Sequence, residues 1–124
     1  MSIPSARQAR WKREDEAARL SAEAPALLEL RLELSESSNG RTVLDSSRIV
    51  HIVVARAAAR FEVPCGDVRC KDGGYDLTHD VMHNVRQRRR SFVGQDSCNG
   101  YLGDHPCIRV LQFVAHAEFQ ASPP

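Results

Sequence analysis

The stretch Leu28-Glu29-Leu30-Arg31-Leu32-Glu33-Leu34 decides the fold, because apolar and charged residues alternate along it with a period of two. Leucine and glutamate intrinsically favour helices, but this alternation places all four leucines on one face of a strand. We therefore predict a strand here, with Leu28, Leu30, Leu32 and Leu34 in the core. The Ser37–Gly40 segment, which ends in Asn-Gly, predicts a turn after it.

Two later segments also predict strands. Arg48–Val63 opens with β-branched residues and continues into alanines, so that strand and helix compete. We predict a strand whose odd positions, from Ile49 to Val63, form one apolar face; the alternative is a helix capped by Ser46 or Ser47. Ile108–Phe119 predicts a final strand, with one face formed by Leu111, Phe113, Ala115, Ala117 and Phe119.

Two segments predict helices. Residues 5–23 are rich in alanine, arginine and glutamate and indicate a polar helix that Ser5 can cap. Residues 77–92 indicate an amphipathic helix, capped by Asp76 or Thr78, whose apolar face carries Leu77, Val81, Val85 and Phe92. The composition of residues 93–107 is typical of a loop.

These elements predict an α+β fold: a small antiparallel sheet of three to four strands with one helix packed on it, zinc-stabilised loops and an N-terminal polar helix. A length of 124 residues is that of one ordinary domain. We divide the chain into an N-terminal polar helical arm (1–24), a single α+β domain (25–120) and a disordered tail (121–124).

Composition excludes several classes of protein. Hydrophobic residues make up 42% and charged residues 27%, which argues against a largely disordered chain. A formal net charge of +1 gives no global attraction to nucleic acid or to an acidic membrane. The N-terminal charges have no apolar stretch behind them, and the run Ile49–Ala55 is too short to span a bilayer. We therefore expect a cytoplasmic protein with no membrane partner.

The four cysteines predict a metal site. Four residues separate Cys65 from Cys70 and eight separate Cys98 from Cys107, and each pair lies where a predicted strand meets a loop. Paired cysteines in turns supply the soft ligands that zinc requires, and a reducing compartment disfavours disulfides. We predict a structural zinc ion bound by all four cysteines, against the alternative of buried free thiols.

Two histidines offer rival chemistry. Cys65 and Cys70 with His79 and His83 form a second possible ligand set, one helical turn separating the histidines. His79-Asp80-x-x-His83 also differs by one methylene from the H-E-x-x-H motif of zinc proteases, where the carboxylate activates a metal-bound water. A zinc-dependent hydrolase is therefore the alternative function, while two solvated histidines are the simplest explanation.

A cluster of cations ends the predicted helix. Arg86, Arg88, Arg89 and Arg90, here called the basic segment, have no acid near them in sequence. Guanidinium groups suit phosphates and carboxylates, although the helix dipole alone favours cations at this end. We predict a non-catalytic, zinc-stabilised binding module that contacts an acidic protein surface or nucleic acid through this segment.

Overall fold

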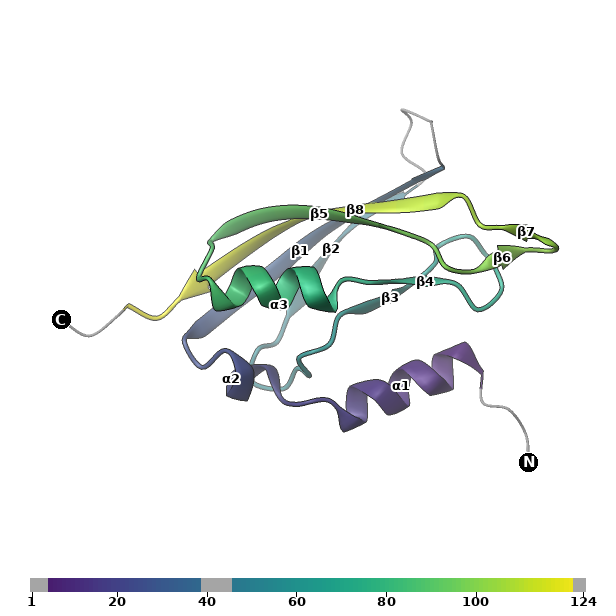
Figure 1. Ribbon diagram of the computed structural model, residues 1–124. Coiled ribbons are helices and arrows are strands. Elements are labelled where there is room, and N and C mark those ends of the chain that lie inside the picture. The colour runs from purple at the N-terminus through teal and green to yellow at the C-terminus, as the bar shows by residue number, and fades with distance from the viewer. Residues whose placement is uncertain (1–4, 39–45, 122–124) are drawn as a thin grey trace.

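The computed structural model describes residues 5–38 and 46–121, and its element order is shown in Figure 1. The helices are α1 (Ala6–Glu16), α2 (Leu20–Glu23) and α3 (Thr78–Arg86). The strands are β1 (Leu27–Ser38), β2 (Ser46–Ile52), β3 (Glu62–Pro64), β4 (Gly74–Asp76), β5 (Ser91–Ser97), β6 (Tyr101–Leu102), β7 (His105–Pro106) and β8 (Arg109–Phe119). Among the described residues, no helix is long and apolar enough to cross a membrane.

Four of these strands form an antiparallel sheet in the order β2-β1-β8-β5, which confirms the predicted α+β class. Helix α3 and the short β3–β4 hairpin lie on one face of this sheet (Figure 1). The predicted apolar faces of β1 and β8 meet there, because side chains alternate along a strand. The core beneath the sheet contains Leu30, Leu32, Leu34, Leu111, Phe113, Ala115, Ala117, Val81 and Val85.

One of the four predicted core leucines is outside. The register between β1 and β8 shifts between Leu27 and Glu29, so that Leu27 is buried while Leu28 is 57% exposed. An extra residue at a β-bulge moves the side chains before it to the opposite face. The alternation of residues 28–34 does not reveal the bulge, because it continues unbroken through it.

The prediction of one strand over Arg48–Val63 is wrong. Strand β2 ends at Ile52, and a turn follows in which the backbone N–H groups of Arg56 and Ala57 donate to the carbonyl of Val53. Within β2 the face is also inverted: Ile49 is exposed, and the even-numbered neighbours Val50 and Ile52 pack against the core.

The later odd positions of this segment do reach the core, as Phe61 is buried and Ala57, Ala59 and Val63 pack against it. The alanine-rich stretch then pairs with the N-terminal segment: the Leu20 N–H donates to the Ala57 carbonyl at 2.9 Å, and the Ala59 N–H donates to the Ala18 carbonyl at 2.7 Å. Its polar backbone groups are therefore satisfied without a longer ladder to β1.

The predicted helix 77–92 is shorter than expected. Helix α3 ends at Arg86, and the chain reverses through Arg88, whose φ is 58°. Phe92 lies on β5, where its ring meets that of Phe113 edge-on at 6.3 Å. The predicted loop 93–107 consequently begins inside a strand and carries the small β6–β7 hairpin. The amphipathic pattern placed Phe92 correctly in the core but on the wrong element.

The N-terminal segment begins as predicted. Ser5 caps α1, since its side chain accepts from the backbone N–H of Gln8 at 3.2 Å and the Gln8 side chain accepts in return at 3.0 Å. The chain then breaks into α2, whose Leu20 is fully buried in the core. The predicted Asn-Gly turn and the last three residues of the predicted tail lie outside the described residues.

Candidate metal centre

The four cysteines lie in two loops at one end of the sheet. Cys65 directly follows β3, and Cys70 lies in the loop that leads to β4. Cys98 directly follows β5, and Cys107 lies just before β8. Mutual backbone hydrogen bonds between Lys71 and Tyr101, of 2.9 and 3.3 Å, hold the two loops side by side.

The four sulfur atoms form a compact cluster. All the Sγ atoms lie within 4.8 Å of one another, with Cys70 and Cys98 3.6 Å apart and Cys65 and Cys107 4.0 Å apart. In a tetrahedral site with Zn–S bonds of about 2.3 Å, ligand sulfurs are about 3.8 Å apart. These two separations therefore match a single tetrahedral ion, and the donor set fits zinc.

Electrostatics favour a cation among these thiols. Burial, together with the neighbouring thiols, raises the pKa of Cys65 to about 11 and also raises the pKa of Cys70. Cys107 differs: burial opposes its ionisation, but the backbone N–H of Arg109 and the adjacent thiols lower its pKa. Several neighbouring thiols resist ionisation because their negative charges would repel one another. A divalent cation compensates these charges, so the thiols lose their protons when it binds, and metal binding here is coupled to proton release.

Two glycines let the loops approach the sulfurs. The backbone N–H of Gly100 donates to the Cys98 sulfur at 3.4 Å. A Cβ atom on Gly73 would lie 2.4 Å from the Cys70 sulfur and 2.6 Å from the Cys98 sulfur. Any side chain at Gly73 would therefore displace at least one sulfur from the cluster.

We expect Gly73→Ala to weaken zinc binding roughly tenfold or more, the range seen when groups that support metal ligands are disturbed. Competition against a chromophoric chelator measures the affinity. Gly103→Ala is the matched control: its Cβ meets nothing within 4 Å, and its φ of 66° adds only backbone strain away from the sulfurs. Equal zinc affinities for Gly73→Ala and wild type would contradict the cluster.

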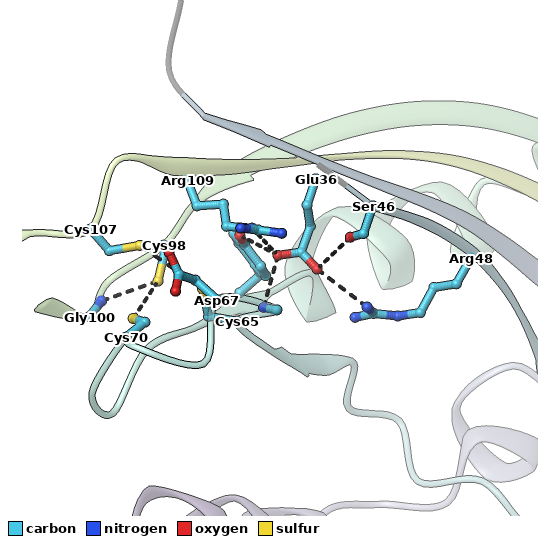
Figure 2. Close-up of polar contacts among 12 residues, drawn as sticks. Glu36, Ser46, Arg48, Cys65, Asp67, Cys70, Cys98, Gly100, Cys107 and Arg109 are labelled. Carbon is cyan, nitrogen blue, oxygen red and sulfur yellow. Dashed lines mark hydrogen bonds and ion pairs between the residues drawn. The ribbon is translucent and has the colours of Figure 1, made fainter. Parts of the chain in front are cut away.

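A buried carboxylate lies beside the cysteine cluster, and we did not predict it (Figure 2). Glu36 of β1 is 1% exposed. Its Oε2 accepts from the Gly66 backbone N–H at 2.9 Å, the Tyr75 hydroxyl at 3.0 Å and the Arg109 Nε at 3.0 Å. Its Oε1 accepts from Ser46 at 3.4 Å and Arg48 at 3.3 Å. Glu36 thus joins the first cysteine loop to β2, β4 and β8.

Glu36 is ionised at neutral pH. Burial alone would raise its pKa, but the Gly66 N–H, the Tyr75 hydroxyl and the Arg109 guanidinium outweigh burial and lower it. Burial and the charge of Glu36 together raise the pKa of Tyr75, which therefore remains a donor. One feature of the sequence could have indicated that Glu36 is buried: it continues the even-numbered face of β1 that carries Leu30, Leu32 and Leu34.

The predicted histidines do not join the cysteines. His79 and His83 stack on the exposed side of α3 with ring centroids 6.2 Å apart. The Asp80 carboxylate lies near β5, where a Cβ on Gly94 would be 3.2 Å from its Oδ2. Within residues 5–38 and 46–121, the four cysteines are the one group of three or more potential ligands that comes together. The structure therefore groups Cys65 and Cys70 with the other cysteines.

The basic segment is present but is not a helix. Only Arg86 belongs to α3, and its Nη2 lies 3.5 Å from the Glu23 Oε2. The other three arginines lie between α3 and β5. Arg88 donates to the Gln120 carbonyl at 2.7 Å and lies over the Phe119 ring at 5.5 Å. All four arginines are exposed. Arg86 and Arg88 thus interact with other residues of the fold, and Arg89 and Arg90 are the arginines whose side chains are more available to a partner.

Comparison with known proteins adds no relative to this description. No family model matches the chain. Neither the curated proteins nor the solved structures contain a match to it.

Proposed function

We propose that the chain is a non-catalytic binding module whose fold is completed by a structural Zn²⁺ ion on Cys65, Cys70, Cys98 and Cys107. The observation that carries this proposal is the approach of all four sulfurs to within 4.8 Å. Four thiolates fill a tetrahedral zinc site, leaving no coordination position for a substrate. The reducing cytoplasm that we expect for this chain keeps such thiols available to metal.

The role of the zinc ion would be to secure the two loops. The β3–β4 and β6–β7 pairs are short, with three and two residues in each strand, and isolated hairpins are marginal in water. A metal that joins both loops supplies the stability that such short ladders lack, since its binding energy is also folding energy.

The contact surface would be the basic segment, Arg86 and Arg88–Arg90, in the turn that leads into β5. Arginine forms paired hydrogen bonds with carboxylates and phosphates, and both kinds of acidic partner therefore suit this segment. The near-neutral charge of the whole chain limits the attraction to this local patch. The partner is thus an acidic protein surface or a nucleic acid.

A salt series with the double variant Arg89→Glu/Arg90→Glu tests this surface. If the partner is nucleic acid, affinity for a generic DNA or RNA should fall steeply with salt. The variant should then lower the log–log slope by about 0.7–0.9 for each phosphate that it no longer neutralises. Arg56→Glu, another exposed arginine, should leave binding unchanged. If the wild-type protein does not bind nucleic acid even at low salt, the partner of the basic segment is an acidic protein. If the double variant binds nucleic acid as tightly as the wild type, the basic segment is not the contact surface.

A further inference from the structure

We propose that the cysteine cluster is also an oxidation site, at which hydrogen peroxide forms two defined disulfides, Cys70–Cys98 and Cys65–Cys107. The inference rests on the proposed four-cysteine zinc site and adds a second state of the same residues: metal-free, oxidised and still folded. Three properties of the cluster carry it: which sulfurs are in contact across the loops, which are accessible, and which segments they join.

Two sulfur–sulfur contacts run between the two loops. Cys70 meets Cys98 at 3.6 Å and Cys65 meets Cys107 at 4.0 Å, and the partners are 28 and 42 residues apart in sequence. These two contacts use every sulfur once. Small movements are therefore sufficient to turn the cluster into two bonds that both cross from one loop to the other.

Access to the sulfurs is uneven. Cys98 and Cys107 are 8% and 7% exposed, whereas Cys65 and Cys70 are more open to solvent. The loop that carries the open pair is itself exposed, with Val68 at its tip 98% exposed. In the zinc-loaded protein all four sulfurs are thiolates, so exposure decides which of them peroxide reaches first, and oxidation begins on the Cys65–Cys70 loop. Each open sulfur contacts a buried sulfur on the other loop.

The chemistry balances with peroxide as the only oxidant. The Cys70 thiolate attacks one peroxide oxygen, the O–O bond breaks, and a sulfenic acid and hydroxide form. The Cys98 thiolate then attacks the Cys70 sulfur and displaces a second hydroxide, which completes the disulfide. Cys65 and Cys107 react in the same way. In total four thiolates lose four electrons, two peroxides accept them, and four protons from the buffer convert the four hydroxides into four water molecules.

Oxidation exchanges one link between the loops for another. Disulfide sulfurs carry no negative charge and no longer hold Zn²⁺, so the ion leaves. The new bonds join the same two loops that the ion had joined, so the sheet and α3 keep their packing. A metal-stabilised fold that simply lost its ion would instead unfold.

The test uses zinc-loaded wild-type protein, with its zinc content measured before any oxidant is added. Peroxide is titrated without oxygen while a chromophoric chelator reports released zinc and a thiol reagent counts free cysteines. We expect two peroxides per protein to release one zinc and remove four thiols, with circular dichroism almost unchanged. Digestion after Arg69 and Tyr101, by trypsin and chymotrypsin, puts each cysteine on its own peptide, so mass spectrometry identifies the bonds.

The expected cross-linked peptides join Cys70 to Cys98 and Cys65 to Cys107, and a thiol reductant with added zinc should restore one bound ion. Cys65–Cys70 and Cys98–Cys107 bonds, retention of zinc after two peroxides, or unfolding on oxidation would each overturn the inference. A protein without zinc at the start would instead contradict the proposed metal site. The two failures are therefore distinguishable.

Discussion

Cys70→Ser should abolish stoichiometric zinc binding and leave the domain largely unfolded at room temperature. Structural zinc contributes roughly 10–16 kcal/mol of apparent binding free energy in small zinc-dependent folds. The net stability of a domain is only about 5–15 kcal/mol. Loss of even a part of the zinc contribution therefore exceeds what the rest of the fold can supply. Elemental analysis of protein purified without chelator should give one zinc for wild type and much less for the variant.

Two controls on α3 make this result specific. His83→Ala and Asp80→Ala change exposed side chains and should leave zinc content and the melting temperature nearly unchanged. Melting of wild type in EDTA should reproduce the instability of Cys70→Ser. Loss of zinc in His83→Ala, with retention in Cys107→Ser, would show that the mixed cysteine–histidine set holds the metal and would favour the hydrolase.

Glu36→Gln should lower the free energy of unfolding by about 3–5 kcal/mol, the usual cost of removing one partner from a buried ion pair. Arg109, whose side chain is 14% exposed, would lose its ion pair with the Glu36 carboxylate. Gly66 and Tyr75 would also compete for a weaker acceptor. Because Gly66 is next to Cys65, zinc affinity should fall as well. Urea denaturation and chelator competition measure the two effects.

Glu33→Gln is the matched control, since Glu33 lies three residues away on the opposite face of β1. Its carboxylate is 2.8 Å from the His116 ring nitrogen, and its side chain is 42% exposed. Surface ion pairs contribute about 0–1 kcal/mol, so this substitution should cost less than about 1 kcal/mol. If both variants lose a similar amount of unfolding free energy, the buried hydrogen bonds of Glu36 contribute no more to stability than an exposed ion pair.

Acid should act through the same carboxylate. The folded-state pKa of Glu36 lies below its ordinary value of 4.5, so its contribution is fully present above pH 4.5 and is lost as the pH falls through the folded pKa. Glu62, which Arg13 and Arg60 hold ionised against its burial, behaves in the same direction. Stability should therefore fall below about pH 4.5, and Glu36→Gln should show a shallower fall than wild type.

The strand patterns of β1 and β8 were predictable because one face of each is buried and the other is not. Period-two alternation is the direct record of that asymmetry. Strand β2 was harder to place, because it is at the edge of the sheet and carries apolar side chains on both faces, Ile49 outside and Val50 inside. A one-residue error in phase then inverts the whole face. The end of β2 depends on turn hydrogen bonds that composition does not encode.

The candidate site was predicted in part. The four cysteines were grouped correctly, because strand ends next to loops are places where a sheet brings distant residues together. Glu36 was missed because a charged residue on an apolar face has the pattern of an interruption. The burial of its carboxylate depends on hydrogen-bond donors from Gly66, Tyr75 and Arg109, which are far from Glu36 in sequence. The role of the basic segment stays a prediction, and its placement on a helix was wrong beyond Arg86, because the sequence did not reveal the reversal at Arg88.

The pairing of β1 with β8 also has a consequence for how the chain is made. The first long strand of the sheet lies between β2 and the last strand, so the backbone N–H and C=O groups along one of its edges stay unpaired until residues 109–119 leave the ribosome. All four cysteines emerge before that strand does. A nascent chain can therefore bring its four cysteines together while this edge of β1 is still unpaired, and slow synthesis past residue 107 would prolong the exposure of an aggregation-prone strand edge.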